Sequence, residues 1–365
     1  MGDLRHAIFA GGFSAIASSR ADRWLRPFAQ GCGLILTFHH VRPDAPGGGA
    51  HAVAQGQFRP NRSLEVTPAF LEATLEALAH AGFECVSMDE VPERLDASRR
   101  GRPFAVITFD DGYRDNVEHA WPILRRRNVP WTLYVVPRFA DGRGVLWWID
   151  LERAIAGADS VVFRVGEDVL SLQTATPAQK AAAFAGVARR LRAAGGKELR
   201  GFVMSLAERE GRDPAATSRE LCADWEDIAA LARDPLVTIG AHSMSHPVLS
   251  RETAETVLEE LGESRRVIAG RLRRPVRHLA YPHGDREAVG VREHVLARAA
   301  GFTTAVTTRP GHLWPAHRAH CHALPRLSMN GRHQTDAALR ALLSGVPFLA
   351  GDLAQRLHAA TVAGG

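Results

Sequence analysis

Short apolar runs, separated by segments with a helical pattern, constrain the fold of this chain more than any other sequence feature. The runs have the length and the β-branched and aromatic content of strands buried on both faces of a parallel sheet. They are Gly33–Phe38, Phe104–Phe109, Trp131–Val136, Leu236–Gly240, His278–Tyr281 and Thr303–Val306. Because strands that alternate with helices pair in parallel, we predict an α/β fold, either a doubly wound sheet or a barrel. In both folds the active site lies at the carboxyl ends of the strands.

One segment breaks this alternation. Residues 160–165 and 169–172 are apolar runs on either side of a turn, which predicts a hairpin, and Thr176 followed by Pro177 opens a helical stretch to about Glu210. We therefore expect residues 150–222 to be an insertion in the main domain.

The main domain is expected to span residues 31–345, between an N-terminal segment, 1–30, and a C-terminal tail, 346–365. The apolar stretch 7–19 is interrupted by glycines and serines, so it is interpreted as part of an amphipathic helix and not as a signal peptide. Since no apolar run of about 20 residues occurs, we expect no transmembrane span, although peripheral membrane contact stays open. A cytoplasmic location is expected over export.

The charge of the chain gives little support to a nucleic-acid partner. The net charge is +5 and the isoelectric point about 9.4, but the arginines are spread over helices and not gathered in one block. The four cysteines lie far apart without a CxxC pair, which is typical of neither a zinc ribbon nor a disulfide framework.

Two adjacent carboxylates, Asp110 and Asp111, follow the strand Phe104–Phe109 directly. Neighbouring residues of a strand point to opposite sides, so the two side chains can serve different partners. A helix N-cap would explain one aspartate but not both. A pair of buried carboxylates needs a cation or a proton, and the pair is therefore a candidate functional site.

A second candidate follows the strand Leu236–Gly240, where His242 and His246 are spaced i,i+4. On one helical turn this spacing brings both imidazoles to one side, where they chelate a divalent metal, whereas the alternative is a pair of capping loop histidines. Both pairs end predicted parallel strands, so one pocket would collect them. Two histidines and one carboxylate form an open, catalytic type of metal site, which leaves the other aspartate to act on a bound water.

Three motifs give the chain a resemblance to a known family. Thr108–Gly112, His242–His246 and Tyr281–Gly284 occur in this order, after an opening Leu36–Val41. Over residues 31–330 the chain resembles the polysaccharide deacetylases with a NodB-homology domain, carbohydrate esterase family 4. The resemblance implies a distorted (β/α) barrel of about seven parallel strands, the glycoside hydrolase/deacetylase type. It also implies a metal-dependent hydrolase that removes acetyl groups from N-acetylglucosamine-containing oligo- or polysaccharides, as a chitooligosaccharide deacetylase does.

The resemblance also implies residue roles. Asp111, His242 and His246 would bind a divalent metal ion, for which zinc is the first expectation, and Asp110 would be the catalytic base. The acetylated sugar would be the partner of the site. We expect Tyr281, Trp147, Trp148 and Arg326 among the substrate-binding residues, with the adjacent tryptophans as a stacking surface or as core residues.

The chain departs from the family pattern at two motifs. Ala280–His283 lacks the arginine that steadies the base in relatives and has His283 in a tyrosine position, although the His283 main-chain N–H can still serve an oxyanion. No Leu-x-His occurs after residue 300 to supply the usual acid. His39 and His283 are the candidate catalytic acids, and Arg326 is a candidate replacement for the missing arginine.

Two other functions stay open at this point. Two histidines and a carboxylate also form the iron site of an oxygenase, but that site belongs on a jelly roll and leaves Asp110 without a role. A carbohydrate-binding relative that has lost catalysis would account for the two missing motif residues.

Overall fold

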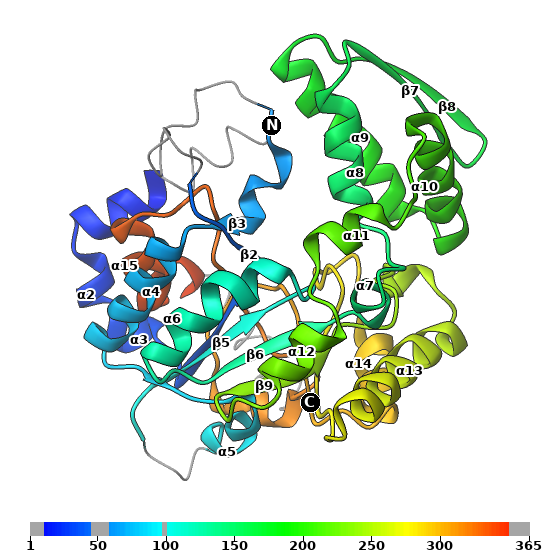
Figure 1. The fold of residues 1–365 in the computed structure, drawn as a ribbon. Coiled ribbons are helices and arrows are strands. Elements are labelled where there is room, and N and C mark those ends of the chain that lie inside the picture. Colours follow the sequence, from blue (N-terminus) through cyan, green and yellow to red (C-terminus); the bar gives the residue numbers. More distant parts are fainter. Residues whose placement is uncertain (1–10, 45–57, 97–100, 350–365) are drawn as a thin grey trace, which may run out of the picture.

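A computed structural model describes residues 11–44, 58–96 and 101–349 of the chain (Figure 1). Residues 1–10 of the expected N-terminal segment and 350–365 of the expected tail lie outside this part. The described N-terminal residues are helical over 11–18 and in α2 and α3, Ala21–Trp24 and Arg26–Ala29.

A curled sheet of parallel strands forms the centre of the molecule, which confirms the predicted barrel type. The strand order is β11-β10-β9-β6-β5-β1-β12, and β4 also pairs with β5. A single parallel bridge joins Val306 to Leu324, just before β12, so the two edges of the sheet approach each other. The strands are β1 Gly33–Phe38, β4 Glu84–Cys85, β5 Phe104–Phe109, β6 Trp131–Val135, β9 Val237–Ala241, β10 His278–Ala280, β11 Thr304–Val306 and β12 Leu327–Ser328.

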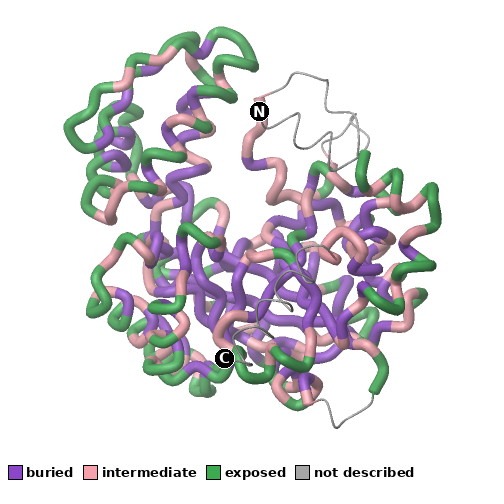
Figure 2. Tube along the Cα trace, turned by 180° about the vertical axis from the view of Figure 1, so that it is seen from behind, coloured by how far each residue is buried: buried purple, intermediate pink, exposed green. Residues whose placement is uncertain are grey.

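Alternate residues of the strands pack on opposite faces of the sheet. In β5, Ile107 and Phe109 belong to the core between the strands and the outer helices, whereas Val106 belongs to a smaller core inside the barrel. Every residue of β1 and β5 is buried, and Figure 2 shows that the centre of the molecule is mostly buried. The apolar runs of the sequence therefore become strands that are buried on both faces.

Helices cover the outside of this sheet. The two long ones are α4, Pro68–His80, in which the Thr67 hydroxyl accepts a hydrogen bond from Phe70 N, and α13, Ala254–Leu272. The others are α5 Val91–Arg94, α6 Trp121–Arg126, α7 Pro137–Ala140, α12 Trp225–Leu231, α14 Val291–Ala299 and α15 Asp336–Ser344. Short helical turns are η1 Pro60–Leu64, η2 Met88–Glu90, η3 Asn116–Ala120, η4 Leu249–Arg251, η5 Pro315–His320 and η6 Val346–Phe348. None of the described helices has the length and apolar character needed to cross a bilayer.

The segment that breaks the alternation forms a separate body beside the barrel (Figure 1). It has its own hydrophobic core and contains the predicted antiparallel hairpin, which is confirmed. The predicted helical stretch is also confirmed, and it consists of two helices because the chain bends at Ala194 and Gly195. The elements are α8 Trp147–Ala156, β7 Ser160–Val165, β8 Asp168–Gln173, α9 Pro177–Ala193, α10 Gly196–Glu210 and α11 Ala216–Leu221.

Candidate active site and metal centre

The two adjacent aspartates leave β5 in different directions. Asp110 follows Val106 and Thr108 on the inner face of the barrel, and its main-chain N–H donates to Phe38 O over 3.0 Å. Asp111 has a φ of 69°, a left-handed conformation that aspartate adopts more readily than most residues. This turn points the second carboxylate away from the first and toward the end of β9.

A loop, and not a helical turn, brings His242 and His246 together, so the predicted helical geometry is wrong. His246 has a φ of 65°, a left-handed conformation incompatible with a continuing helix. Glu260 of α13 holds this loop by accepting hydrogen bonds from Met244 N at 2.9 Å and from Ser245 N at 2.8 Å. The two imidazoles therefore come together because of the shape of this loop, which Glu260 of α13 holds in place.

Asp111, His242 and His246 form a buried group whose ligand atoms all lie within 4.8 Å of one another. Asp111 Oδ1 is 3.5 Å from His242 Nε2 and 3.4 Å from His246 Nε2. Atoms that each bind one tetrahedral cation at about 2.0–2.2 Å are roughly 3.3–3.5 Å apart, so the spacing fits a metal site. His242 Nδ1 lies 2.7 Å from Ala280 O, which assigns the proton to Nδ1 and leaves Nε2 free as a ligand.

Arg326 donates two parallel hydrogen bonds to the carboxylate of Asp110. Its guanidinium donates to Asp110 Oδ1 over 2.7 Å and to Asp110 Oδ2 over 2.6 Å. The same group donates to Thr307 O, at 2.9 Å, and Arg326 has no exposed surface. Bidentate pairs of this kind fix both the position and the plane of a carboxylate.

These neighbours set the ionisation of the site. Burial alone would raise the pKa of Asp110, but the Arg326 charge outweighs it and the pKa lies below its usual value. Burial likewise opposes ionisation of Asp111, but its contacts with His242 and His246 outweigh burial and keep its pKa below the usual value. Burial lowers the pKa of His246 to about 4, so its imidazole is neutral at pH 7, as a metal ligand must be.

The two candidate acids lie on different sides of this centre. His39 Nε2 is 4.0 Å from Asp110 Oδ2, and the His39 side chain is 17% exposed. The His283 ring contacts the His246 ring, with centroids 4.9 Å apart, and its Nε2 is buried with no partner among the described residues. Gly284 allows the sharp turn at this point, because a Cβ there would lie 2.7 Å from Thr308 N.

The four residues expected to bind substrate have buried side chains, and their role stays a prediction. Tyr281 donates its hydroxyl to His322 O over 2.8 Å and has no exposed surface. Trp147 and Trp148 are 5% and 7% exposed and pack in the core of the insertion, so neither offers an open ring face to a sugar. The Arg326 guanidinium is occupied by Asp110 and Thr307, which makes it a neighbour of the base.

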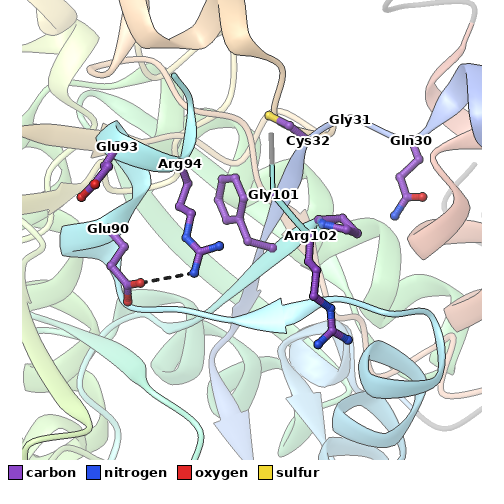
Figure 3. Close-up of a pocket in the computed structure, with 10 residues that line it drawn as sticks. Gln30, Gly31, Cys32, Glu90, Glu93, Arg94, Gly101 and Arg102 are labelled. Atoms are coloured by element: carbon purple, nitrogen blue, oxygen red, sulfur yellow. Dashed lines mark ion pairs between the residues drawn. The ribbon is translucent and has the colours of Figure 1, made fainter. Parts of the chain in front are cut away.

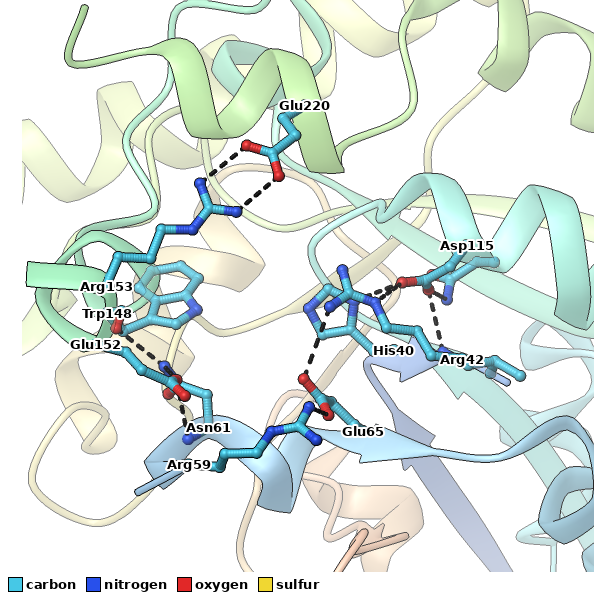
Figure 4. Close-up of polar contacts among 12 residues, drawn as sticks. His40, Arg42, Arg59, Asn61, Glu65, Asp115, Trp148, Glu152, Arg153 and Glu220 are labelled. Carbon is cyan, nitrogen blue, oxygen red and sulfur yellow. Dashed lines mark hydrogen bonds and ion pairs between the residues drawn. The ribbon is translucent and has the colours of Figure 1, made fainter. Parts of the chain in front are cut away.

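Asp115 is a part of the site region that the motifs do not identify (Figure 4). Its carboxylate accepts hydrogen bonds from Val41 N at 3.0 Å and Arg42 Nε at 2.8 Å, and lies 2.6 Å from His40 Nδ1. The contacts fix the segment that carries His39. The only sequence signal is the position of Asp115 five residues after Asp110, on the turn that follows the motif.

A pocket of about 620 Å³ lies at the opposite ends of β1 and β5 (Figure 3). Arg94 pairs with Glu90 on one side of it, and Cys32 and Arg102 also line the pocket. No group of metal ligands occurs there among the described residues. The candidate active site is therefore at the carboxyl ends of the strands, where the possible metal ligands lie, and not in this pocket.

Comparisons with known proteins agree with the geometry. A putative polysaccharide deacetylase of Bacillus subtilis, YxkH, is 28% identical over 87 residues, which are 24% of this chain and 29% of that protein. The Streptococcus pyogenes deacetylase PplD in complex with acetate has a similar fold, with a TM-score of 0.51, 15% identity and coverage of 82% of this chain and 92% of that one. A de-N-acetylase from Aggregatibacter actinomycetemcomitans has a TM-score of 0.53 and 13% identity, over 85% of this chain and 99% of that one.

The family model for polysaccharide deacetylases matches residues 97–305, which include Asp110, Asp111, His242 and His246. The match extends over more than half of the sequence, and this chain belongs to the polysaccharide deacetylase family.

Proposed function

We propose that this protein hydrolyses N-acetyl groups of N-acetylglucosamine-containing oligo- or polysaccharides, with a divalent metal ion held by Asp111, His242 and His246. The observation that carries the proposal is the convergence of these three residues beside Asp110, which Arg326 holds in the ionised form. Zinc is the first candidate for two imidazoles and one carboxylate. The bound acetate in the structurally similar deacetylase PplD is the product that this reaction would release.

Asp110 is the base in this proposal. A bound divalent cation would polarise the acetyl carbonyl and acidify water beside it. Asp110 then takes a proton from the attacking water, which its low pKa permits because the carboxylate is ionised at neutral pH. Arg326 keeps the carboxylate in one orientation throughout. In this proposal the main-chain N–H of His283 would stabilise negative charge on the acetyl oxygen.

His39 is the acid that the distances favour. Burial lowers the pKa of His39 more than the Asp110 charge raises it, so the imidazole is neutral before the reaction. It has to gain a proton before it can act as an acid, and the Asp110 carboxyl, 4.0 Å away, is a source once it has taken one from water. His39 then delivers this proton to the leaving amine as the C–N bond breaks.

Acetate release from N-acetylchitooligosaccharides tests the proposal. We expect release by the metal-loaded protein, loss after chelation, recovery with zinc, and a strong loss in Asp110→Asn. A metal-loaded protein that binds these sugars but releases acetate from no acetylated glycan would instead be a carbohydrate-binding protein. Oxygen consumption with iron and a keto acid would favour the oxygenase.

A further inference from the structure

An exposed aromatic patch lies on α2 and α3, away from the candidate active site. Trp24 is 77% exposed, Phe28 71% and Leu25 42%. The other large apolar side chains exposed in the described part of the chain are aliphatic residues and a methionine. Monomeric soluble proteins rarely expose neighbouring aromatic rings, so a patch of this kind indicates a binding surface.

The backbone places these side chains on one face. Leu25 N donates to Ala21 O and Ala29 N to Leu25 O, both over 3.0 Å, so α2 and α3 form a nearly continuous helix. Trp24 and Phe28 are one turn apart on it and therefore point in the same direction.

The opposite side of this helix is anchored to the domain. Asp22 is buried and accepts a hydrogen bond of 2.9 Å from Arg340 of α15, and Ala29 is buried at the other end. Figure 1 shows α2 and α3 beside α15 at the side of the barrel. The aromatic face is thus held outward by a folded element.

The charge around the patch is mainly positive. Arg20 and Arg23 flank Trp24 and form no ion pair with any described residue, whereas Asp22 is the single acidic residue in 11–29 and is already paired. Next to the patch is a groove of about 440 Å³, lined by Arg23, Arg26, His80 and Arg340 together with Asp22 and Asp336. Aromatic rings flanked by unpaired arginines suit a partner whose surface carries negative charge and whose interior is apolar.

We propose that Trp24, Leu25 and Phe28, flanked by Arg20 and Arg23, dock onto the surface of an anionic phospholipid bilayer. The rings would enter the boundary between headgroups and acyl chains, and the arginines would bind lipid phosphates. A second copy of the chain fits less well, because a two-fold contact through this patch would bring each arginine near its own symmetry mate. α3 ends before the N-terminal end of β1, so docking there leaves the opposite strand ends, with Asp110, accessible.

The proposal does not rest on deacetylation and is tested separately, by sedimentation of the full chain with vesicles. We expect binding to vesicles of phosphatidylcholine with phosphatidylglycerol and weak binding to phosphatidylcholine alone, with a loss at high salt. Trp24→Ser combined with Phe28→Ser should weaken binding by about tenfold or more. Arg20→Gln combined with Arg23→Gln should remove the preference for anionic vesicles.

The matched control is Val291→Ser combined with Val295→Ser, an exposed i,i+4 apolar pair on α14, which should bind as the wild type does. Brominated lipids should quench the wild-type tryptophan fluorescence and should quench Trp24→Phe less, a readout that needs no loss of binding. The proposal is overturned if the wild type does not bind anionic vesicles, or if the Trp24/Phe28 variant binds them as well as the wild type does. It is also overturned if light scattering shows a dimer that this variant converts to a monomer.

Discussion

Arg326 and Asp110 are 216 residues apart in the sequence, yet they form a fully buried ion pair through two hydrogen bonds of 2.7 and 2.6 Å. The arginine precedes β12 and the aspartate follows β5, so β1, which pairs with both strands, fixes their separation. The orientation of the proposed base is therefore built into the sheet itself.

Removing this pair should change the pH dependence of the reaction. Since Arg326 lowers the pKa of Asp110, Arg326→Met should raise that pKa and move the acid limb of the kcat/KM profile to higher pH. Arg326→Lys keeps the charge and should shift the limb less. The Met variant also leaves a buried carboxylate unpaired, so we expect a loss of about 3–5 kcal/mol in unfolding free energy. A folded variant with an unchanged acid limb would restrict Arg326 to a structural role.

Loss of one proposed ligand should greatly weaken metal binding without unfolding the chain. We expect His246→Gln to weaken zinc binding by about 100-fold or more in calorimetric titrations, because it removes one of three protein ligands. His80→Gln, at an exposed position on α4, is the control and should bind zinc normally. Equal affinities in both variants would place the metal elsewhere.

The loop that carries His246 should depend on Glu260. Glu260→Ala removes the acceptor for Met244 N and Ser245 N, so the loop should lose its shape and zinc affinity should fall by about 10–100-fold. Its exposed neighbour on the same helix, Glu259, supplies the control Glu259→Ala. If the two variants bind zinc alike, the loop does not need this anchor.

Asp115 should contribute stability that depends on pH. Burial would raise the pKa of Asp115, but the hydrogen bond and charge of His40, with Arg42, lower it below the unfolded value. The folded protein therefore gains stability above the unfolded pKa of about 3.9 and loses it as the pH falls through the lower, folded pKa.

Denaturant unfolding of Asp115→Asn measures this contribution. We expect a loss of about 2–3 kcal/mol at pH 7 that shrinks toward pH 3, whereas Asp168→Asn, at an exposed carboxylate, should change little. A loss independent of pH would mean that packing, and not charge, is responsible.

The sequence was sufficient for the sheet and for the candidate ligands, because each ligand follows an apolar run whose strand direction is set by alternation with helices. Different partners for Asp110 and Asp111 were expected from the strand period, but the strand ends at Phe109 and the left-handed turn at Asp111 separates the two carboxylates. The loop at His246 was not predictable, since its left-handed backbone depends on Glu260, which comes from another element.

The sequence could not predict which aromatic side chains near the site are exposed to solvent. Trp147 and Trp148 begin an amphipathic helix, and only the packing of the insertion decides that both rings are covered. Tyr281 follows a strand in the same way as the aspartates, but its ring is buried and its hydroxyl donates to His322 O.

The cytoplasmic location of the protein stays a prediction.

The position of Arg326 has a consequence for how this domain can be shortened. The region that matches the family model ends at residue 305, before both β12 and the arginine. A fragment cut at that boundary would retain the proposed ligands and the base, but it would lose the edge strand next to β1 and the cation opposite Asp110. The smallest unit able to keep its base ionised and aligned therefore extends at least through Ser328, and expression fragments should be designed to include it.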